Sequence, residues 1–196
     1  MSVKKIVVIG PESTGKSTLC LQLAEHYQTV WCPEYAREYL EKNGTNYTYD
    51  DLLTIAKGQI DLEEKNITKT IGNWEITNNP ELETQNPKHQ LLFIDTDMYV
   101  MKVWCEFAFN KCHSWILNQI ATRKYDLYLL CNVDLPWIAD ELREYPDMET
   151  RNKLYHFYKD IMVNQSVAWV NISGNYEERL ETAIKAIDTK IPGLGG

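Results

Sequence analysis

The sequence lacks the features that would connect it to a disulfide scaffold, a membrane or a nucleic acid. Its five cysteines are odd in number and include no Cys-x-x-Cys pair, which argues against a disulfide framework or a zinc knuckle. The apolar run Ile6–Ile9 is too short for a signal peptide or a membrane span, so we expect a cytoplasmic protein with reduced thiols. Basic residues are few, because 20 Lys and Arg stand against 28 Asp and Glu, a net charge of −8. This balance argues against non-specific binding to nucleic acid or to an anionic membrane, but it is compatible with a local phosphate site.

The composition that remains is that of one ordinary globular domain. The 196 residues are 44% apolar and 24% charged, enough to bury a core without metal or disulfide staples. We expect a single domain over residues 1–190. The last residues, Ile191-Pro-Gly-Leu-Gly-Gly196, cannot continue a helix and predict a flexible tail over 191–196.

Short apolar runs alternate along the chain with longer segments of helical period. Runs rich in Val, Ile and Leu are typical of strands buried on both faces of a parallel sheet. Their alternation with helices predicts a doubly wound α/β fold with helices on both faces. The expected strands are Ile6–Ile9, Leu91–Ile94, Leu127–Cys131 and Val167–Ile172, with a weaker one around Thr29–Cys32. The expected helices are Ser17–Tyr27, Glu34–Lys42, Tyr49–Thr70, Met98–Phe109, Ser114–Arg123, Thr150–Asn164 and Tyr176–Thr189.

One stretch, residues 72–90, breaks this alternation. It carries four Asn and two Pro and has little apolar periodicity. Such a composition predicts a surface insertion in front of the strand Leu91–Ile94.

A phosphate-binding motif follows the first expected strand and opens the first expected helix. Gly10-Pro-Glu-Ser-Thr-Gly-Lys-Ser-Thr18 matches G-x-x-x-x-G-K-[ST] in the strand–helix context that a P-loop requires. The glycines allow consecutive N–H groups to face one concavity, and the helix N-terminus adds its dipole. We expect Lys16 to reach the β- and γ-phosphates, Ser17 to bind Mg²⁺ and Thr18 to lie near the α-phosphate. The predicted nucleotide-binding residues are Gly10, Glu12, Ser13, Thr14, Gly15, Lys16, Ser17 and Thr18.

Two carboxylates end the apolar run Leu91–Ile94. Because residues two apart in a strand share a face, Asp95 and Asp97 are expected on the same side. Asp95 is the expected Walker B acid, which holds Mg²⁺ through water, and together with Ser17 it forms the predicted metal site. Two roles fit Asp97: contact with the metal or the substrate, or the N-cap of the helix that follows.

A further polar pair follows the weak second strand. Glu34 and Arg37 lie three residues apart and share a helix face. In a P-loop kinase, a carboxylate at this place can accept a proton from an attacking hydroxyl. An arginine there can hold the acceptor or the transferred phosphoryl group. The pair fits equally well a helix-start carboxylate with an (i, i+3) ion pair.

Aromatic residues flank the same expected cleft. Trp31, Tyr35, Tyr39, Trp104 and Trp137 are placed where they could stack on a flat ring, cationic if the acidic balance extends to the cleft. Ordinary packing is the alternative for each of them.

The charged connection after Leu127–Cys131 suits a lid, which we expect over residues 134–152. It contains Arg143 and ends with Arg151, and their guanidinium groups could spread over the γ-phosphoryl group in the transition state. A solvated charged loop is the alternative.

Six blocks of the sequence, in this order, resemble a known family. The chain is similar to the nicotinamide-riboside kinase domain of NadR-type proteins, in the NadR/Ttd14-like AAA group, over about residues 4–188. The blocks are Gly10–Thr18, Pro33–Tyr39, Phe93–Asp97, Lys102–Trp104, Pro136–Asp140 and Leu142–Arg143.

The resemblance implies a P-loop kinase-like parallel sheet of strand order 2-3-1-4-5, with ATP and Mg²⁺ bound. It implies phosphorylation of the 5′-hydroxyl of nicotinamide riboside to give nicotinamide mononucleotide. The catalytic residues are then expected to be Lys16, Glu34, Asp95, Arg143 and Arg151. The substrate-binding residues are expected to be Glu34, Tyr35, Arg37, Asp97, Trp104, Trp137 and Asp140.

The chain also departs from the family pattern. NadR-type proteins often carry an N-terminal adenylyltransferase domain with a His-x-Gly-His signature, which this sequence lacks, so a second step to NAD is expected of another protein. The insertion at residues 72–90 is foreign to the compact pattern. Two rival functions share the motifs: a kinase for another nucleoside or vitamin-like alcohol, and a nucleotide-hydrolysing regulatory ATPase or GTPase. The absence of an Asn-Lys-x-Asp guanine signature weighs against GTP.

Overall fold

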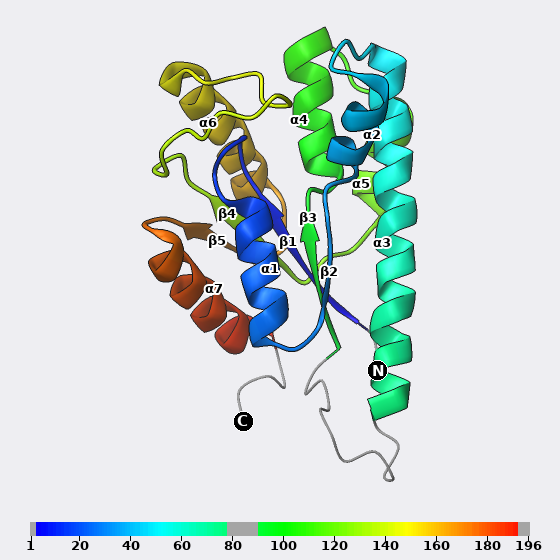
Figure 1. The fold of residues 1–196 in the computed structure, drawn as a ribbon, viewed down its shortest axis with the longest axis vertical. Helices are drawn as coiled ribbons and strands as arrows, with labels where there is room; N and C mark the ends of the chain where they lie inside the picture. Colours follow the sequence, from blue (N-terminus) through cyan, green and yellow to red (C-terminus); the bar gives the residue numbers. More distant parts are fainter. Residues whose placement is uncertain (1–2, 78–89, 192–196) are drawn as a thin grey trace.

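The computed structural model describes residues 3–77 and 90–191 of the chain. Its centre is one five-stranded sheet in the order β2-β3-β1-β4-β5, in which every neighbouring pair is parallel (Figure 1). The predicted doubly wound sheet, its strand order and its weak second strand are confirmed. The strands are β1 (Lys4–Ile9), β2 (Val30–Cys32), β3 (Leu91–Asp95), β4 (Leu127–Cys131) and β5 (Trp169–Ile172).

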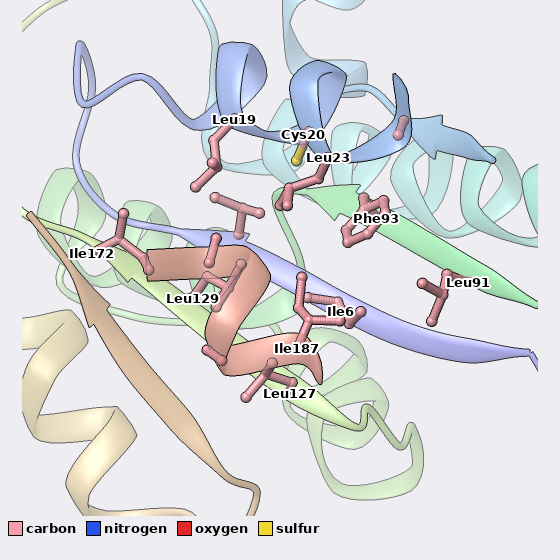
Figure 2. Packing of buried hydrophobic residues seen from close by; sticks show 14 of the residues in the cluster. Ile6, Leu19, Cys20, Leu23, Leu91, Phe93, Leu127, Leu129, Ile172 and Ile187 are labelled. Carbon is pink, nitrogen blue, oxygen red and sulfur yellow. The ribbon is translucent and has the colours of Figure 1, made fainter. Parts of the chain in front are cut away.

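Helices cover both faces of the sheet, which is why its strands read as unbroken apolar runs. Helices α1 and α7 pack on one face; Figure 2 shows Leu19 and Leu23 of α1 and Ile187 of α7 meeting Ile6 and Leu129 of the sheet. Helices α4 and α6 pack on the other face. The helices are α1 (Lys16–His26), α2 (Tyr35–Asn43), α3 (Tyr49–Thr77), α4 (Met98–Phe109), α5 (Ser114–Thr122), α6 (Met148–Asn164) and α7 (Tyr176–Lys190).

The register of the sheet brings the predicted functional segments to one edge. Val8 of β1 pairs with Asp95 of β3, and Ile9 pairs with Leu130 of β4. These three strands therefore end at the same level, where the P-loop, Asp95 and the connection after β4 meet. Helices α2, α4 and α6 extend beyond this edge (Figure 1). Ligands of doubly wound sheets bind outside the carboxyl ends of the strands, so this edge is the candidate site.

Helix α3 is longer than the sequence predicted. It continues to Thr77, through the first part of the expected insertion, instead of ending at Thr70. Gly72 weakens a helix by about 1 kcal/mol but does not stop it, and no proline occurs between Tyr49 and Pro80. The rest of the insertion, residues 78–89, lies outside the described residues. No helix within 3–77 and 90–191, α3 included, is long and apolar enough to cross a membrane.

Two other boundaries are corrected. The expected lid over 134–152 includes the first turn of α6, because Asp147 caps that helix by accepting a hydrogen bond from the Thr150 N–H at 2.7 Å. Ile191, which was placed in the flexible tail, is buried in the core beside α1 and α7. The remaining tail residues, 192–196, lie outside the described residues.

We expect Gly58→Ala to destabilise the protein, although alanine normally favours a helix by about 1 kcal/mol over glycine. A Cβ at Gly58 of α3 would overlap the ring of Tyr35 at the start of α2. The expected loss, measured by urea unfolding, is about 1–3 kcal/mol. In a Tyr35→Leu background the same glycine change should cost little; equal losses in both backgrounds would contradict the contact.

Candidate active site

A cavity of about 220 Å³ lies at the carboxyl edge of the sheet, between the P-loop and helices α2, α4 and α6. All nine P-loop residues from Gly10 to Thr18 line it. The lining also includes Glu34 and Arg37, with apolar and aromatic side chains of α4, α6 and the connection before α6. One cavity therefore joins a phosphate-binding loop to a second surface that contains a carboxylate.

The backbone of the P-loop requires glycine where it leaves β1. Gly10 has φ of +142°, and a Cβ there would lie 2.7 Å from the carbonyl oxygen of Cys131 on β4. Gly15 adopts the left-handed conformation at the N-cap of α1. The chain can therefore turn tightly over the sheet and enter α1 with its first N–H groups at the cavity.

Cationic side chains hold the carbonyl groups of the P-loop. Arg151 donates to the Ser13 carbonyl at 3.2 Å, and Arg179 donates to the Thr14 carbonyl at 3.0 Å. Lys16 Nζ donates to the Pro11 carbonyl at 3.0 Å. In a trans peptide the N–H points opposite to the C=O. The N–H groups of Thr14 and Gly15 are therefore directed away from the two arginines.

Arg179 was not among the predicted site residues. It is 2% exposed and also donates to the carbonyls of Gly174 and Asn132 and pairs with Asp134. One side chain thus connects the P-loop to the ends of β4 and β5. The sequence held one signal for it, since Arg179 falls on the apolar face of α7 with Ala183 and Ala186.

Asp95 lies beside Ser17, which lines the cavity, although Asp95 is not itself part of the lining. The Ser17 hydroxyl donates to Asp95 Oδ2 at 2.5 Å. The Asp95 carboxyl is fully buried, and its Oδ1 has no hydrogen-bond partner among the described residues. Burial, followed by the charge of Glu34, raises the pKa of Asp95 to about 6, against the lowering effect of Lys16 and Ser17.

The Ser17 hydroxyl and the Asp95 carboxylate are suitable ligands for Mg²⁺. The cation prefers hard oxygen ligands and usually takes one or two from the protein, with waters and substrate phosphates completing the octahedron. A buried carboxylate oxygen without a donor, next to a serine hydroxyl, provides such ligands. Within residues 3–77 and 90–191 no cluster of three His, Cys, Asp or Glu provides an all-protein cage. Ser17 and Asp95 would therefore hold the ion together with phosphate oxygens.

Asp97 is placed outside the cavity. Its carboxylate caps α4 by accepting from the N–H groups of Tyr99 at 2.9 Å and Val100 at 3.4 Å. It also accepts from the Tyr128 hydroxyl at 2.9 Å. Burial raises its pKa to about 7, against these hydrogen bonds, which lower it. Of the two roles considered for Asp97, the structure therefore favours the helix cap, and the contact with metal or substrate loses its geometric basis.

Glu34 and Arg37 line the cavity at the start of α2, as their shared helix face predicted. Glu34 Oε1 accepts from the Thr96 hydroxyl at 3.3 Å. Arg37 pairs with Asp140 of the connection before α6, with Nη2 and Oδ2 3.0 Å apart. The backbone N–H of Leu142 and then Arg37 lower the pKa of Asp140. Asp140 does not line the cavity itself but contacts two residues that do, Arg37 and Leu142.

The predicted aromatic residues separate into two groups. Trp104 lines the cavity, with its indole N–H donating to the Tyr47 hydroxyl at 2.8 Å. Tyr35 instead packs on Gly58 of α3, outside the cavity lining. Trp137 also lies outside the lining, with its ring 5.9 Å from the guanidinium of Arg143 and 5.5 Å from that of Arg151.

The two predicted lid arginines differ in position. Arg143 lines the cavity and donates to the Ser13 hydroxyl at 3.4 Å. Arg151 is 1% exposed and donates to the carbonyls of Ser13 and Leu135. Because it belongs to the first turn of α6 and is enclosed there, Arg151 supports the P-loop from outside the cavity.

The connection between β4 and α6 is attached to the P-loop through Glu12 and Ser13. Glu12 accepts from the N–H groups of Glu144 at 2.9 Å and Tyr145 at 3.2 Å, while the Ser13 hydroxyl accepts from the Ile138 N–H at 2.9 Å. Burial raises the pKa of the Glu12 carboxyl. Glu12, predicted to bind nucleotide, therefore holds the connection between β4 and α6.

Residues 5–179 match the family model described as an AAA domain. The chain belongs to this family. The trifunctional NAD biosynthesis/regulator proteins NadR of Salmonella typhimurium and Escherichia coli are 23% and 24% identical over 94% of this AAA-domain chain. The chain spans 42% of the length of these curated relatives.

Solved structures agree with this assignment. A NadR protein in complex with NR (nicotinamide riboside) has a TM-score of 0.73 and 25% identity, over 96% of this chain and 49% of that one. NadR with NAD and AMP-PNP has a TM-score of 0.70 and 24% identity over the same shares. Thymidylate kinase from Ehrlichia chaffeensis has a TM-score of 0.59 and 16% identity, over 96% and 99%. The AAA-domain chain therefore has the P-loop kinase fold, and its resemblance to NadR-type proteins is confirmed.

We expect Arg179→Met to lower both stability and nucleotide affinity. The change leaves Asp134 and the Thr14 carbonyl without their cation, which should cost about 3 kcal/mol of unfolding free energy. AMP-PNP affinity, measured by titration calorimetry, should fall about tenfold or more because the P-loop amides lose their support. The control is Lys185→Met, which removes the same charge from an exposed position of α7. Unchanged AMP-PNP affinity in a folded Arg179→Met protein would contradict this role.

We expect Asp95→Asn to raise the stability of the nucleotide-free protein at neutral pH. The folded pKa of about 6 lies above the ordinary value of 3.8, so ionising Asp95 costs the fold stability as pH rises through this interval. The variant should therefore gain about 2 kcal/mol at pH 7.5, and the gain should shrink towards pH 4.5. Thermal unfolding across this range measures it, with the exposed α3 change Asp61→Asn as control. A gain independent of pH would refute the burial argument.

Proposed function

We propose that this protein is an ATP-dependent kinase that phosphorylates the 5′-hydroxyl of nicotinamide riboside, giving nicotinamide mononucleotide. The observation that carries the proposal is the continuity of one cavity from the P-loop to Glu34. A hydrolase that acts on water alone has no need of a second surface of this kind. The relatives support the acceptor, because a NadR structure of the same fold contains NR.

The nucleotide end supports ATP as the donor. The P-loop amides and the N-terminus of α1 would bind the β- and γ-phosphates, with Lys16 turning from the Pro11 carbonyl to the phosphate oxygens. When bound beside Ser17 and Asp95, Mg²⁺ supplies positive charge to the β- and γ-phosphate oxygens. A NadR structure with AMP-PNP supports an adenine nucleotide at this end.

The acceptor end supports a flat ring that carries positive charge. It is lined by four aromatic side chains, those of Trp104, Phe107, Tyr145 and Tyr158, and Glu144 adds a carboxylate. Aromatic faces attract cations by about 0.5–2 kcal/mol, and a carboxylate strengthens the preference. A pyridinium ribose is flat and cationic at its base, so this surface favours it over a neutral nucleoside.

The transfer step requires one base and an arrangement of cations. Glu34 accepts the proton of the attacking 5′-hydroxyl, whose oxygen bonds to the γ-phosphorus as the bond to the β–γ bridging oxygen breaks and ADP leaves. Glu34 is proposed as the base in preference to Asp97, because only Glu34 lines the cavity. Lys16 and Arg143, both at the cavity, neutralise charge on the moving phosphoryl group.

The test is a coupled ADP assay with ATP, Mg²⁺ and a panel of pyridine ribosides, nucleosides and vitamin-like alcohols, with the product confirmed by mass. We expect ADP release that depends on nicotinamide riboside and matches the product one to one. Turnover with a different alcohol alone would replace the acceptor and retain the kinase. ADP release that no alcohol stimulates would identify a nucleotide hydrolase and reject the proposal.

Glu34→Gln should lower kcat by 10²–10⁴-fold, the usual contribution of a general base. The KM for ATP should change little, because Glu34 is not one of the P-loop residues that bind the phosphates. The matched control is Glu38→Gln, which neutralises an exposed carboxylate on the same helix. Similar kcat values for the two variants would reject Glu34 as the base.

A further inference from the structure

Gln59 occupies a buried position where three segments of the site meet. It lies on α3, is 1% exposed, and is neither part of a motif nor a residue of the cavity lining. Its amide faces the end of β2, the start of α2 and the end of β3. These are the three places that position Glu34 and Asp95.

The amide uses both its acceptor and its donors. Oε1 accepts from the Tyr35 N–H at 2.7 Å. Nε2 lies 3.3 Å from the Pro33 carbonyl, 3.4 Å from the Asp95 carbonyl and 3.5 Å from the sulfur of Cys32. The backbone groups on both sides of Glu34 are therefore held by the same planar amide that holds the backbone of Asp95.

This arrangement leaves the Glu34 carboxylate available to the cavity. Glu34 is the N-cap residue of α2, where a side chain usually accepts from the first N–H groups of its helix. Here Glu34 makes no capping hydrogen bond, and the first helical N–H, that of Tyr35, is satisfied by Gln59 instead. A glutamine amide both donates and accepts through one planar group without depending on protonation.

We propose that Gln59 is a positioning residue that fixes the proposed base Glu34 relative to the metal-binding Asp95. This inference rests on the proposed kinase function for Glu34, while the Asp95 half requires only Mg²⁺-dependent nucleotide binding. The reaction needs the hydroxyl, the phosphorus and the metal aligned, and an error of about 1 Å in such a site can cost about 10²-fold in rate.

The test compares Gln59→Met, Gln59→Glu and the control Thr70→Val. Methionine retains length without hydrogen bonds. Glutamate keeps an acceptor for the Tyr35 N–H, but in place of the amide N–H groups that face the carbonyls of Pro33 and Asp95 it has at most one O–H, when protonated. The control removes another buried polar group of α3, a hydroxyl that donates to the Asn66 carbonyl at 2.9 Å. Kinetics with riboside and ATP are measured beside AMP-PNP titrations with and without Mg²⁺.

Gln59→Met should lower kcat about 10–100-fold, while the KM for ATP stays within about threefold of the wild-type value. The variant should also reduce about fivefold the gain in AMP-PNP affinity that Mg²⁺ produces. Gln59→Glu should show the same loss of Mg²⁺-dependent gain, which keeps the test valid if the methionine variant does not fold. Thr70→Val should leave both quantities unchanged. The proposal is overturned if folded Gln59 variants keep wild-type kcat and Mg²⁺ gain, or if Thr70→Val loses as much. A wild-type protein that phosphorylates no acceptor rejects the kinase, while the AMP-PNP titrations still test the link from Gln59 to Asp95.

Discussion

The shape of the P-loop depends on two buried guanidinium groups, those of Arg151 and Arg179. They bind consecutive carbonyls, at Ser13 and Thr14, from outside the cavity. A buried charge is costly unless hydrogen bonds and an opposite charge accompany it. The two guanidinium groups donate to carbonyls of three segments, which are the P-loop and the connections that follow β4 and β5, and Arg179 also pairs with Asp134. The fixed fork of arginine suits several carbonyls at once, which a lysine would not match. Because these carbonyls are held, the amides at Thr14 and Gly15 are oriented before any phosphate arrives.

The acidic residues of the site have two different roles, which the net charge of the chain does not distinguish. Glu12 and Asp97 bind backbone N–H groups, one holding the connection between β4 and α6 and the other the start of α4. Oδ1 of Asp95 has no hydrogen-bond partner among the described residues, and the side chain of Glu34 makes no capping hydrogen bond to α2. The first two carboxylates therefore shape the cavity, and the last two retain unused capacity for ligands. Burial raises the pKa of Glu12, Asp95 and Asp97 alike, so burial alone does not distinguish these roles.

The sequence predicted what local pattern determines and missed what distant packing determines. The sheet, the P-loop and the pairing of Ser17 with Asp95 follow from apolar runs and a motif whose parts adjoin along the chain or at one sheet edge. The role of Asp97 could not be decided from the sequence, because a helix cap and a ligand occupy the same place after a strand; its hydrogen bonds to the start of α4 and to the Tyr128 hydroxyl favour the cap. The charge of its segment predicted Arg151 to be a lid cation, but the packing of α6 encloses its side chain. Gln59 and Arg179 come from helices remote in sequence from the backbone groups that they hold, so the sequence does not show these partners, although the place of Arg179 on the apolar face of α7 indicates that it is buried.

The division of the cavity between elements has a consequence for how such proteins diversify. The nucleotide end is built by the P-loop and α1, and α1 also packs in the core of the fold. The rest of the cavity lining comes from α2, α4, α6 and the connection before α6, and α4 is attached to the sheet through the cap at Asp97. Substitutions at Trp104 or Phe107 would therefore reshape the cavity without changing a residue of the P-loop. In the proposed kinase, the choice of acceptor can therefore change during evolution while the residues of phosphoryl transfer stay the same.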